Sequence, residues 1–535
     1  MRFPGSGDDR KLSAEKQKKS LHWHFLGGNN KNRIGANCGL CVYEETDIFG
    51  QVRKKALLFD AGLLSGDPRW PEAPVLTDSD TVIPDLTAYL RKKDDPTHKP
   101  ETQIDSIYLT HNHSDHVGAL PFLILMGYEL PKIYATPYTA KRLEQELANA
   151  GVPSEDWPEV FTIAPGKSIS EGPVTVTAFW VSHSTPQSVG FFIETPEGNI
   201  LNPGDFKLDK TVLWGPAFNQ DQLTRLIDGK TVDLLLLDST GADRDITPVT
   251  EEEVRETLRS LMEQHPHKRF IIAVMGGFEE NMASAARVAA EYGRDLWIAG
   301  WSHEQSLSAL KETGMTLQDH IGLPLSIRAL MPGKAARDLA DSDPSRSVVI
   351  VTGAQGKPSA ALTRAAEGRH NALSLDPEKD IVLFCAPSIP GQEGGRERLF
   401  ALLRKAGVPY LTRKEIPLYS HAHARLPELI DMVRLTDPKT VTPIHGDDAL
   451  RQHCAAAMQK MEKTVTSADN GAVLRVTKQG VIKVSEEEPR LIGFKTLQGG
   501  NWMDRHYLMV KTQDAQPVTP ANNNQKKKPM IFKRP

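Results

Sequence analysis

The chain has 535 residues, 64 Lys and Arg, 68 Asp and Glu, a formal net charge of −4 and a pI near 6.5. This length predicts two or three domains rather than one. The weak negative charge excludes a field over the whole molecule that attracts nucleic acid, although bound metal ions or a local basic groove can still hold a polyanion. No apolar run is long enough to cross a bilayer, and no signal-peptide pattern is present. We therefore expect a cytoplasmic protein without a membrane partner.

The chain begins with a polar, Lys-rich stretch, residues 1–20, which predicts a mobile extension. Two apolar runs follow, Ala36–Tyr43 and Ala56–Phe59, and both are typical of buried strands. The second run delivers Asp60 at its end. Cys38 and Cys41 have the spacing of a redox pair or half a zinc site, but the other two cysteines are isolated, so we interpret both as strand residues.

The densest group of metal-binding side chains follows the short apolar run Ile104–Leu109, which predicts a strand. Within six residues lie His111, His113, Asp115 and His116. An apolar, helix-length run, Val117–Met126, comes next, so this group occupies a loop at the carboxyl end of a strand, where α/β sheets bind ligands. Neutral imidazole and carboxylate are ligands for Zn²⁺ or Mn²⁺. One ion can be shared by the first two histidines, and a second ion is within reach of the Asp and the last His.

The next stretch predicts more strands with candidate ligands at their ends. Lys132–Ala135 and a helical stretch after Pro137 form a strand–helix unit, and alternating apolar residues predict strands over 174–182, 188–194 and 199–201. His183 and Asp205 follow two of these strands. A continuous apolar run, Val232–Leu237, predicts a buried strand that ends at Asp238.

From about residue 247 helices alternate with short apolar strands, which predicts a second, parallel sheet. The predicted helices are Glu251–Gln264, Glu280–Tyr292 and Glu304–Glu312, and the predicted strands are Phe270–Met275, Leu296–Ala299, Val348–Val351 and Ile381–Phe384. After this part, Lys439–Ile444 predicts a strand that ends at His445, a helix starts at Ala449, and Ala472–Val484 predicts a hairpin. Candidate metal ligands therefore stand on both sides of an inserted α/β unit.

The spacing His-x-His-x-Asp-His after a strand resembles the signature of the metallo-β-lactamase fold. Asp60, His183 and Asp205 match the further motifs of that fold in order. The resemblance implies an α/β fold with an αββα sandwich and two metal ions. It assigns His111, His113 and His183 to one ion, Asp115, His116 and His445 to the other, and Asp205 to both. It also implies that Asp60 and Asp238 accept hydrogen bonds from the ligand imidazoles and fix their tautomers.

The inserted unit resembles the β-CASP domain of nucleases, and the ribonuclease J branch in particular. Asp238-Ser239-Thr240 resembles motif A, His423 motif B and His445 motif C, and Thr352-Gly353-Ala354-Gln355-Gly356 resembles a motif beside the active-site cleft. The first glycine-rich hairpin, from His24 to Cys38, also resembles that branch. We therefore expect five segments: an extension, 1–20; a metallo-β-lactamase domain in two parts, 21–246 and 413–486; a β-CASP domain, 247–412; and a largely disordered tail, 487–535.

The resemblance implies a metal-dependent ribonuclease that cleaves phosphodiester bonds, as an endonuclease, a 5′→3′ exonuclease or both, with a water molecule activated by two divalent ions. Zn²⁺ is the first choice and Mn²⁺ the second. His423 is the expected general acid, with His421 as the alternative, and Asp115 and Asp205 complete the catalytic group. The residues expected to contact single-stranded RNA are Ser420, His421, His423, Thr352, Gly353 and Gln355.

Motif B departs from the family pattern. Tyr419-Ser420-His421-Ala422-His423 stands where the branch usually has His-x-Ser-Gly-His, so recognition of a 5′ phosphate stays open. About 50 residues follow the last hairpin, too few for the usual C-terminal domain, so a homodimer and a homotetramer both stay open. A hydrolase of DNA or of a small phosphodiester is the alternative function. A catalytically silent scaffold is disfavoured because every ligand position is filled.

Overall fold

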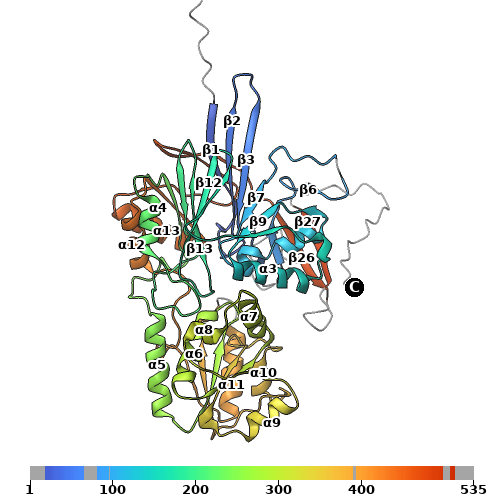
Figure 1. Cartoon of the computed structure of the whole chain (residues 1–535), viewed down its shortest axis with the longest axis vertical. Coiled ribbons are helices and arrows are strands. Elements are labelled where there is room, and N and C mark those ends of the chain that lie inside the picture. The colour runs from blue at the N-terminus through green and yellow to red at the C-terminus, as the bar shows by residue number, and fades with distance from the viewer. Residues whose placement is uncertain (1–17, 66–80, 96, 390–392, 498–505, 513–535) are drawn as a thin grey trace, which may run out of the picture.

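The structure is a computed structural model, and it describes residues 18–65, 81–95, 97–389, 393–497 and 506–512. Two regions lie one above the other in Figure 1, a β-sandwich and a smaller α/β domain. The expected mobile extension lies almost wholly outside the described residues. None of the helices in the described part of the chain combines the length and the apolar character needed to span a bilayer.

Two mixed sheets form the sandwich. The eight-stranded sheet has the order β10 (Val160–Thr162), β9 (Lys132–Ala135), β7 (Ser106–Tyr108), β3 (Val52–Phe59), β2 (Cys38–Thr46), β1 (Lys18–Gly27), β24 (Ala472–Thr477) and β25 (Gly480–Glu486). The seven-stranded sheet has the order β11 (Ser168–Glu171), β12 (Val174–Trp180), β13 (Val189–Glu194), β14 (Asn199–Asn202), β15 (Leu234–Asp238), β22 (Thr440–Ile444) and β23 (Thr464–Val465). Both sheets therefore combine strands from before and after the insertion.

Three apolar layers hold this sandwich together. Between the sheets, Trp23 and Phe59 of one sheet pack in the same cluster as Phe191 and Leu234 of the other. The outer face of the eight-stranded sheet is covered by α2 (Leu120–Leu125) and α3 (Pro137–Ala150), and that of the seven-stranded sheet by α4 (Gln220–Ile227), α12 (Leu426–Thr436) and α13 (Asp448–Lys460). This arrangement is the expected αββα sandwich.

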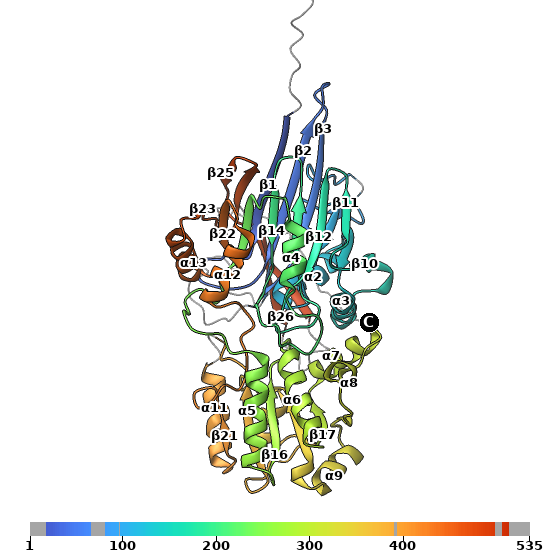
Figure 2. The same ribbon diagram turned by 60° about the vertical axis from the view of Figure 1, so that its left-hand side comes forward.

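The inserted domain contains a six-stranded parallel sheet with helices on both faces (Figure 2). Its strand order is β18 (Ile327–Ala329), β17 (Asp295–Ala299), β19 (Ser347–Val351), β16 (Arg269–Val274), β20 (Asp380–Cys385) and β21 (Tyr410–Leu411). Its helices are α5 (Glu251–Gln264), α6 (Glu279–Glu291), α7 (Trp301–Glu312), α8 (Leu317–Ile321), α9 (Lys334–Asp341), α10 (Ala361–Ala366) and α11 (Glu393–Lys405). The predicted second parallel sheet is therefore confirmed. Helices that link parallel strands cover both faces of the sheet, which is why its strands are apolar throughout.

Two expectations need correction. The run Val117–Met126 is not one helix, because α1 (Ser114–Val117) starts inside the histidine motif and is separated from α2 by Gly118 and Ala119. The backbone bends there because Ala119 N–H donates to the Ala61 carbonyl, 2.9 Å away.

The expected disorder after residue 486 is wrong for β26 (Leu491–Leu497), which pairs with β5 (Thr81–Pro84) and β27 (His506–Thr512). Residues 513–535 lie outside the described part of the chain.

Candidate metal centre

The ends of several strands place candidate ligands at one edge of the sandwich. The histidine motif follows β7, His183 follows β12, Asp205 follows β14, and His445 follows β22. Because β14, β15 and β22 are parallel neighbours, their carboxyl ends emerge together. The strand order thus gathers residues that are up to 334 positions apart in the sequence, as counted from His111 to His445.

Three overlapping groups of side chains have ligand atoms within 4.8 Å of one another. The first group is His111, His113, His183 and Asp205; the second is Asp115, His116, Asp205 and His445; the third is Asp205, Asp238, His423 and His445. Asp205 belongs to all three. We refer to the first two groups below as corner 1 and corner 2.

In corner 1, backbone carbonyls fix which nitrogen of two imidazoles carries the hydrogen. His113 donates its Nε2–H to the carbonyl of Gly277 at 2.8 Å, and His183 donates its Nδ1–H to the carbonyl of Ala422 at 2.8 Å. Each ring then keeps a lone pair on its other nitrogen, and those two nitrogens face each other at 3.2 Å. Two facing lone pairs repel unless a cation or a proton lies between them.

Corner 2 has the same organisation. His116 donates from Nδ1 to Asp60 Oδ2 at 2.8 Å, so its Nε2 accepts, and this atom lies 3.1 Å from Asp205 Oδ2. The Thr240 hydroxyl donates to the His445 carbonyl at 2.7 Å and accepts from His445 Nδ1 at 2.6 Å. His445 Nε2 therefore faces Asp115 Oδ2 at 3.2 Å, and a proton or a cation is needed between these two atoms.

These residues fit divalent metal ions. The Nε2 atom of His111 is fully buried and has no hydrogen-bond partner in the described part of the chain, although it lies 3.8 Å from Asp205. An unsatisfied buried nitrogen is costly, and a metal ion would satisfy it. Imidazoles that are hydrogen-bonded on the far nitrogen and point a lone pair inward are the usual ligands of such ions.

The negative charges of the carboxylates in the site also favour binding of a cation. Burial, together with the neighbouring histidines, lowers the pKa of His111 and His183, so both are neutral and able to bind a metal. Burial also acts to lower the pKa of His445, but Asp205, Asp115 and Asp238 outweigh it and raise that pKa to about 10. Without an ion, the carboxylates hold a proton on this histidine, and a divalent ion supplies the same positive charge.

Backbone strain occurs at two residues beside the site. Asp60 has φ 59° and His445 has φ 53°, both in the left-handed region that non-glycine residues seldom adopt. Asp60 accepts hydrogen bonds from the Thr110 N–H and hydroxyl, each 2.8 Å long, and so holds the start of the histidine loop. Strain of this kind persists where surrounding contacts enforce it, and it is concentrated at functional sites.

His423 lies at the rim of this centre. Its Nδ1–H donates to Asp238 Oδ2 at 2.7 Å, and its side chain remains 22% exposed. Burial lowers the pKa of His423, but the charges of Asp238 and Asp205 raise it above its usual value. His423 is thus a partly exposed imidazole at the edge of a buried group of ligands.

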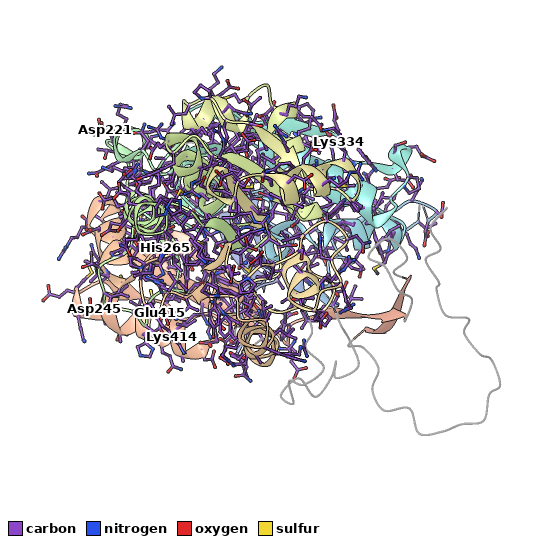
Figure 3. The ribbon with its side chains drawn as sticks, turned by 90° about the horizontal axis from the view of Figure 1, so that it is seen from below. Asp221, Asp245, His265, Lys334, Lys414 and Glu415 are labelled. Carbon is purple, nitrogen blue, oxygen red and sulfur yellow. The ribbon has the colours of Figure 1, made fainter. Side chains whose placement is uncertain are left out.

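His421 points into a group of arginines instead. Both of its ring nitrogens face the Arg413 guanidinium, at 2.8 and 3.2 Å, and its Nδ1 also contacts the buried Arg425. In the view of Figure 3, Lys414 and Glu415 lie on the same side of the molecule as Asp245. Leu426 N–H, which follows motif B, donates to the Arg244 carbonyl at 3.2 Å. The loop after motif A therefore contacts the start of α12, directly after motif B.

Of the other expected substrate-binding residues, two are buried, Ser420 and Gln355. Ser420 is buried and hydrogen-bonded to Lys207 and Glu251. Gln355 donates to the Pro387 carbonyl at 2.6 Å, and Thr352 and Gly353 form the loop after β19. Their contact with RNA stays a prediction.

Comparison with known proteins decides the family. The model "Beta-lactamase superfamily domain" matches residues 75–268, and the model "Ribonuclease J, beta-CASP domain" matches residues 267–401. The chain belongs to the β-CASP family of metallo-β-lactamase-fold proteins. Its inserted α/β unit is the β-CASP domain, and the sandwich is the metallo-β-lactamase domain.

Proteins of similar sequence can be aligned over most of the length of this chain. Ribonuclease J of Sinorhizobium meliloti is 28% identical over 468 residues, which is 87% of this chain and 76% of the relative. Ribonuclease J 1 of Streptococcus pyogenes is 29% identical and covers 80% of this chain and 71% of the relative. A crystal structure of a protein of unknown function from Enterococcus faecalis has a TM-score of 0.59 at 15% identity, over 85% of this chain and 100% of that one, and shares the fold.

Two residues that orient ligands of the metal centre have no recognisable sequence pattern. Gly277 and Ala422 act through backbone carbonyls, which every residue possesses. Thr110 and Thr240 stand directly beside the recognised motifs, so their contacts to His111 and His445 were within reach of sequence reasoning.

Proposed function

We propose that the protein is a metal-dependent ribonuclease of the ribonuclease J type, with two divalent ions bound in corners 1 and 2. The observation that carries this proposal is the inward lone pair on His111, His113, His183, His116 and His445, combined with the carboxylate of Asp205 between both corners. The relatives named ribonuclease J support RNA as the substrate. Two divalent ions, when bound, supply the positive charge that activates water and stabilises a phosphodiester under attack.

The side chains of this protein then have separate tasks. Asp60 and Thr240 hold His116 and His445 in the tautomers that present Nε2 to the centre. Because Nδ1 of His423 donates to Asp238, the acidic proton of the protonated imidazole is the one on Nε2, and His423 donates this proton to the leaving ribose oxygen. The pKa of His423, raised by Asp238 and Asp205, keeps that proton available near neutral pH.

The identity of the metal, the form of the RNA, the location and the assembly are further parts of this proposal. Zn²⁺ is the expected metal, because histidine-rich sites favour it over Mn²⁺. The expected substrate is single-stranded RNA and the expected location is the cytoplasm, while a homodimer and a homotetramer both stay open. The buried, unpaired state of all four cysteines agrees with a reducing compartment.

The test uses purified protein with Zn²⁺ or Mn²⁺ and single-stranded RNA labelled at its 3′ end. The RNA carries a 5′ monophosphate, triphosphate or hydroxyl, and a DNA of the same sequence is run beside it. The double variant Asp115→Ala, His116→Ala controls for contaminating nucleases. Release of mononucleotides from the monophosphate RNA alone identifies a 5′-dependent exonuclease, and internal fragments identify an endonuclease. Binding of two ions without RNA cleavage contradicts the proposal.

A further inference from the structure

The β-CASP domain contributes directly to corner 1 through one glycine. Gly277 lies in the loop between β16 and α6, 164 residues from the histidine that it contacts. Its carbonyl accepts the Nε2–H of His113 at 2.8 Å. This bond leaves the lone pair on Nδ1, the nitrogen that faces His183. The orientation of a corner 1 ligand thus depends on a loop of the inserted domain.

The loop is fixed in this position by bonds to the sandwich. Ser184 donates its hydroxyl to the Gly277 carbonyl at 3.0 Å, and the Glu280 N–H donates to the Ser184 carbonyl at 3.1 Å. The buried Glu280 carboxyl group accepts from the backbone N–H groups of Leu213 and Trp214, at 2.9 to 3.1 Å. The first turn of α6 is therefore attached to the domain that contains the metal site.

A glycine is required at this position for two reasons. Gly277 has φ +87°, a conformation that costs other residues free energy. A Cβ atom at this position would also lie 3.1 Å from both Cδ2 and Nε2 of the His113 ring. Even an alanine would therefore push on the ring that the carbonyl orients.

Corner 2 has no such dependence among its described contacts. His116 donates to Asp60, which follows β3, and His445 donates to Thr240, which follows β15. Both partners belong to the sandwich itself. The two corners therefore differ in whether the inserted domain must be in place to orient a ligand.

We propose that Gly277 is a positioning residue for the metal centre, and that its carbonyl makes ion binding in corner 1, but not in corner 2, depend on the seated β-CASP domain. The inference rests on the proposed two-ion site. It needs no assumption about RNA, because ion binding can be measured without a substrate. Loss of a hydrogen-bond partner of a metal-binding histidine typically weakens metal binding about 10- to 100-fold.

The test measures Zn²⁺ bound per chain by equilibrium dialysis in four full-length proteins: wild type, Asp115→Ala, Gly277→Ala and the double variant. Asp115→Ala weakens corner 2, so the ion that remains reports on corner 1. We expect Gly277→Ala to keep one tight ion, and the double variant to bind its remaining ion about 10- to 100-fold more weakly than Asp115→Ala does. Gly172→Ala is the control, since Gly172 also has positive φ, at +66°, but no atom within 4 Å of the added Cβ.

Folding is checked by circular dichroism in the presence of a chelator. If Gly277→Ala does not fold, Ser184→Ala replaces it, because this change removes a hydrogen bond that holds the Gly277 loop against the sandwich. Equal ion affinity in Asp115→Ala and the double variant overturns the inference, and so does a wild-type protein that binds only one ion. Two ions in the wild type without RNA cleavage would refute the proposed function and leave this inference standing.

Discussion

His423 and Asp238 form a 2.7 Å hydrogen bond in which the imidazole donates from Nδ1 and the buried carboxylate accepts. The negative charge of Asp238 favours the protonated form of His423 and is the largest effect that raises its pKa. The same carboxylate lies 3.4 Å from His445 Nδ1, so it links motif A to motifs B and C.

Replacing Asp238 by asparagine should therefore shift the pH dependence of cleavage. The general acid must be protonated, so activity falls as pH rises through the pKa of His423. Asp238→Asn removes the charge that raises this pKa, so the fall should begin at lower pH, with kcat reduced about 10- to 100-fold. The measurement is kcat against pH on RNA at saturating metal. An unchanged alkaline limb in a variant that retains both ions would contradict the role of His423.

The metal-free protein should lose stability as pH rises. In the folded, metal-free state the pKa of His445 is about 10, whereas an unfolded chain has the usual value of 6.5. The stabilisation from this raised pKa is complete below about pH 6.5 and is lost as pH rises towards 10. We expect the Tm of chelator-treated protein to fall over this range, and the Tm of zinc-loaded protein to fall less. Parallel Tm curves for the two forms would argue against an ion that replaces the proton.

Cys38 and Cys41 should behave as core residues. Both are buried on β2 without a disulfide, and burial raises the pKa of the Cys41 thiol to about 12 and that of the Cys38 thiol well above its usual value. Since thiolates are the reactive form, we expect no reaction with a thiol reagent in the native protein and full reaction after unfolding. Rapid labelling of either residue in the folded chain would revive the redox or zinc interpretation.

Arg413 should affect the choice of RNA 5′ end. Its guanidinium group faces His421 and lies over the ring of Tyr419, with the centroid 4.8 Å away, and it forms no ion pair with a carboxylate in the described part of the chain. Its charge is thus available to a phosphate of the substrate. A charged hydrogen bond contributes about 1.5 to 3 kcal/mol, so Arg413→Ala should reduce the preference for a 5′ monophosphate about 10- to 100-fold. The comparison is kcat/KM on 5′-phosphate and 5′-hydroxyl RNA, and an equal loss on both would exclude a role in 5′ recognition.

The features predicted correctly from the sequence have local signals. The histidine motif, the strands before His183 and Asp238, and α5 all follow from alternation, continuous apolar runs or capping residues, and α5 extends over the residues predicted for it. The pairing of β26 with β5 was missed, because it joins segments about 400 residues apart through backbone hydrogen bonds. The approach of Gly277 to His113 was missed for the same physical reason. Contacts between backbone groups distant in sequence leave no residue pattern to recognise.

The sandwich is completed only by strands that follow the β-CASP domain. β22 carries His445 to corner 2, and β24 pairs with β1, the first described strand of the chain. During synthesis, which proceeds from the N-terminus, β1 can pair with β2 early, but its other edge stays unpaired until residues 472–477 have left the ribosome. A nascent chain that ends before His445 has no complete corner 2. Both corners of the metal centre can therefore be complete only after the last fifth of the chain has begun to emerge.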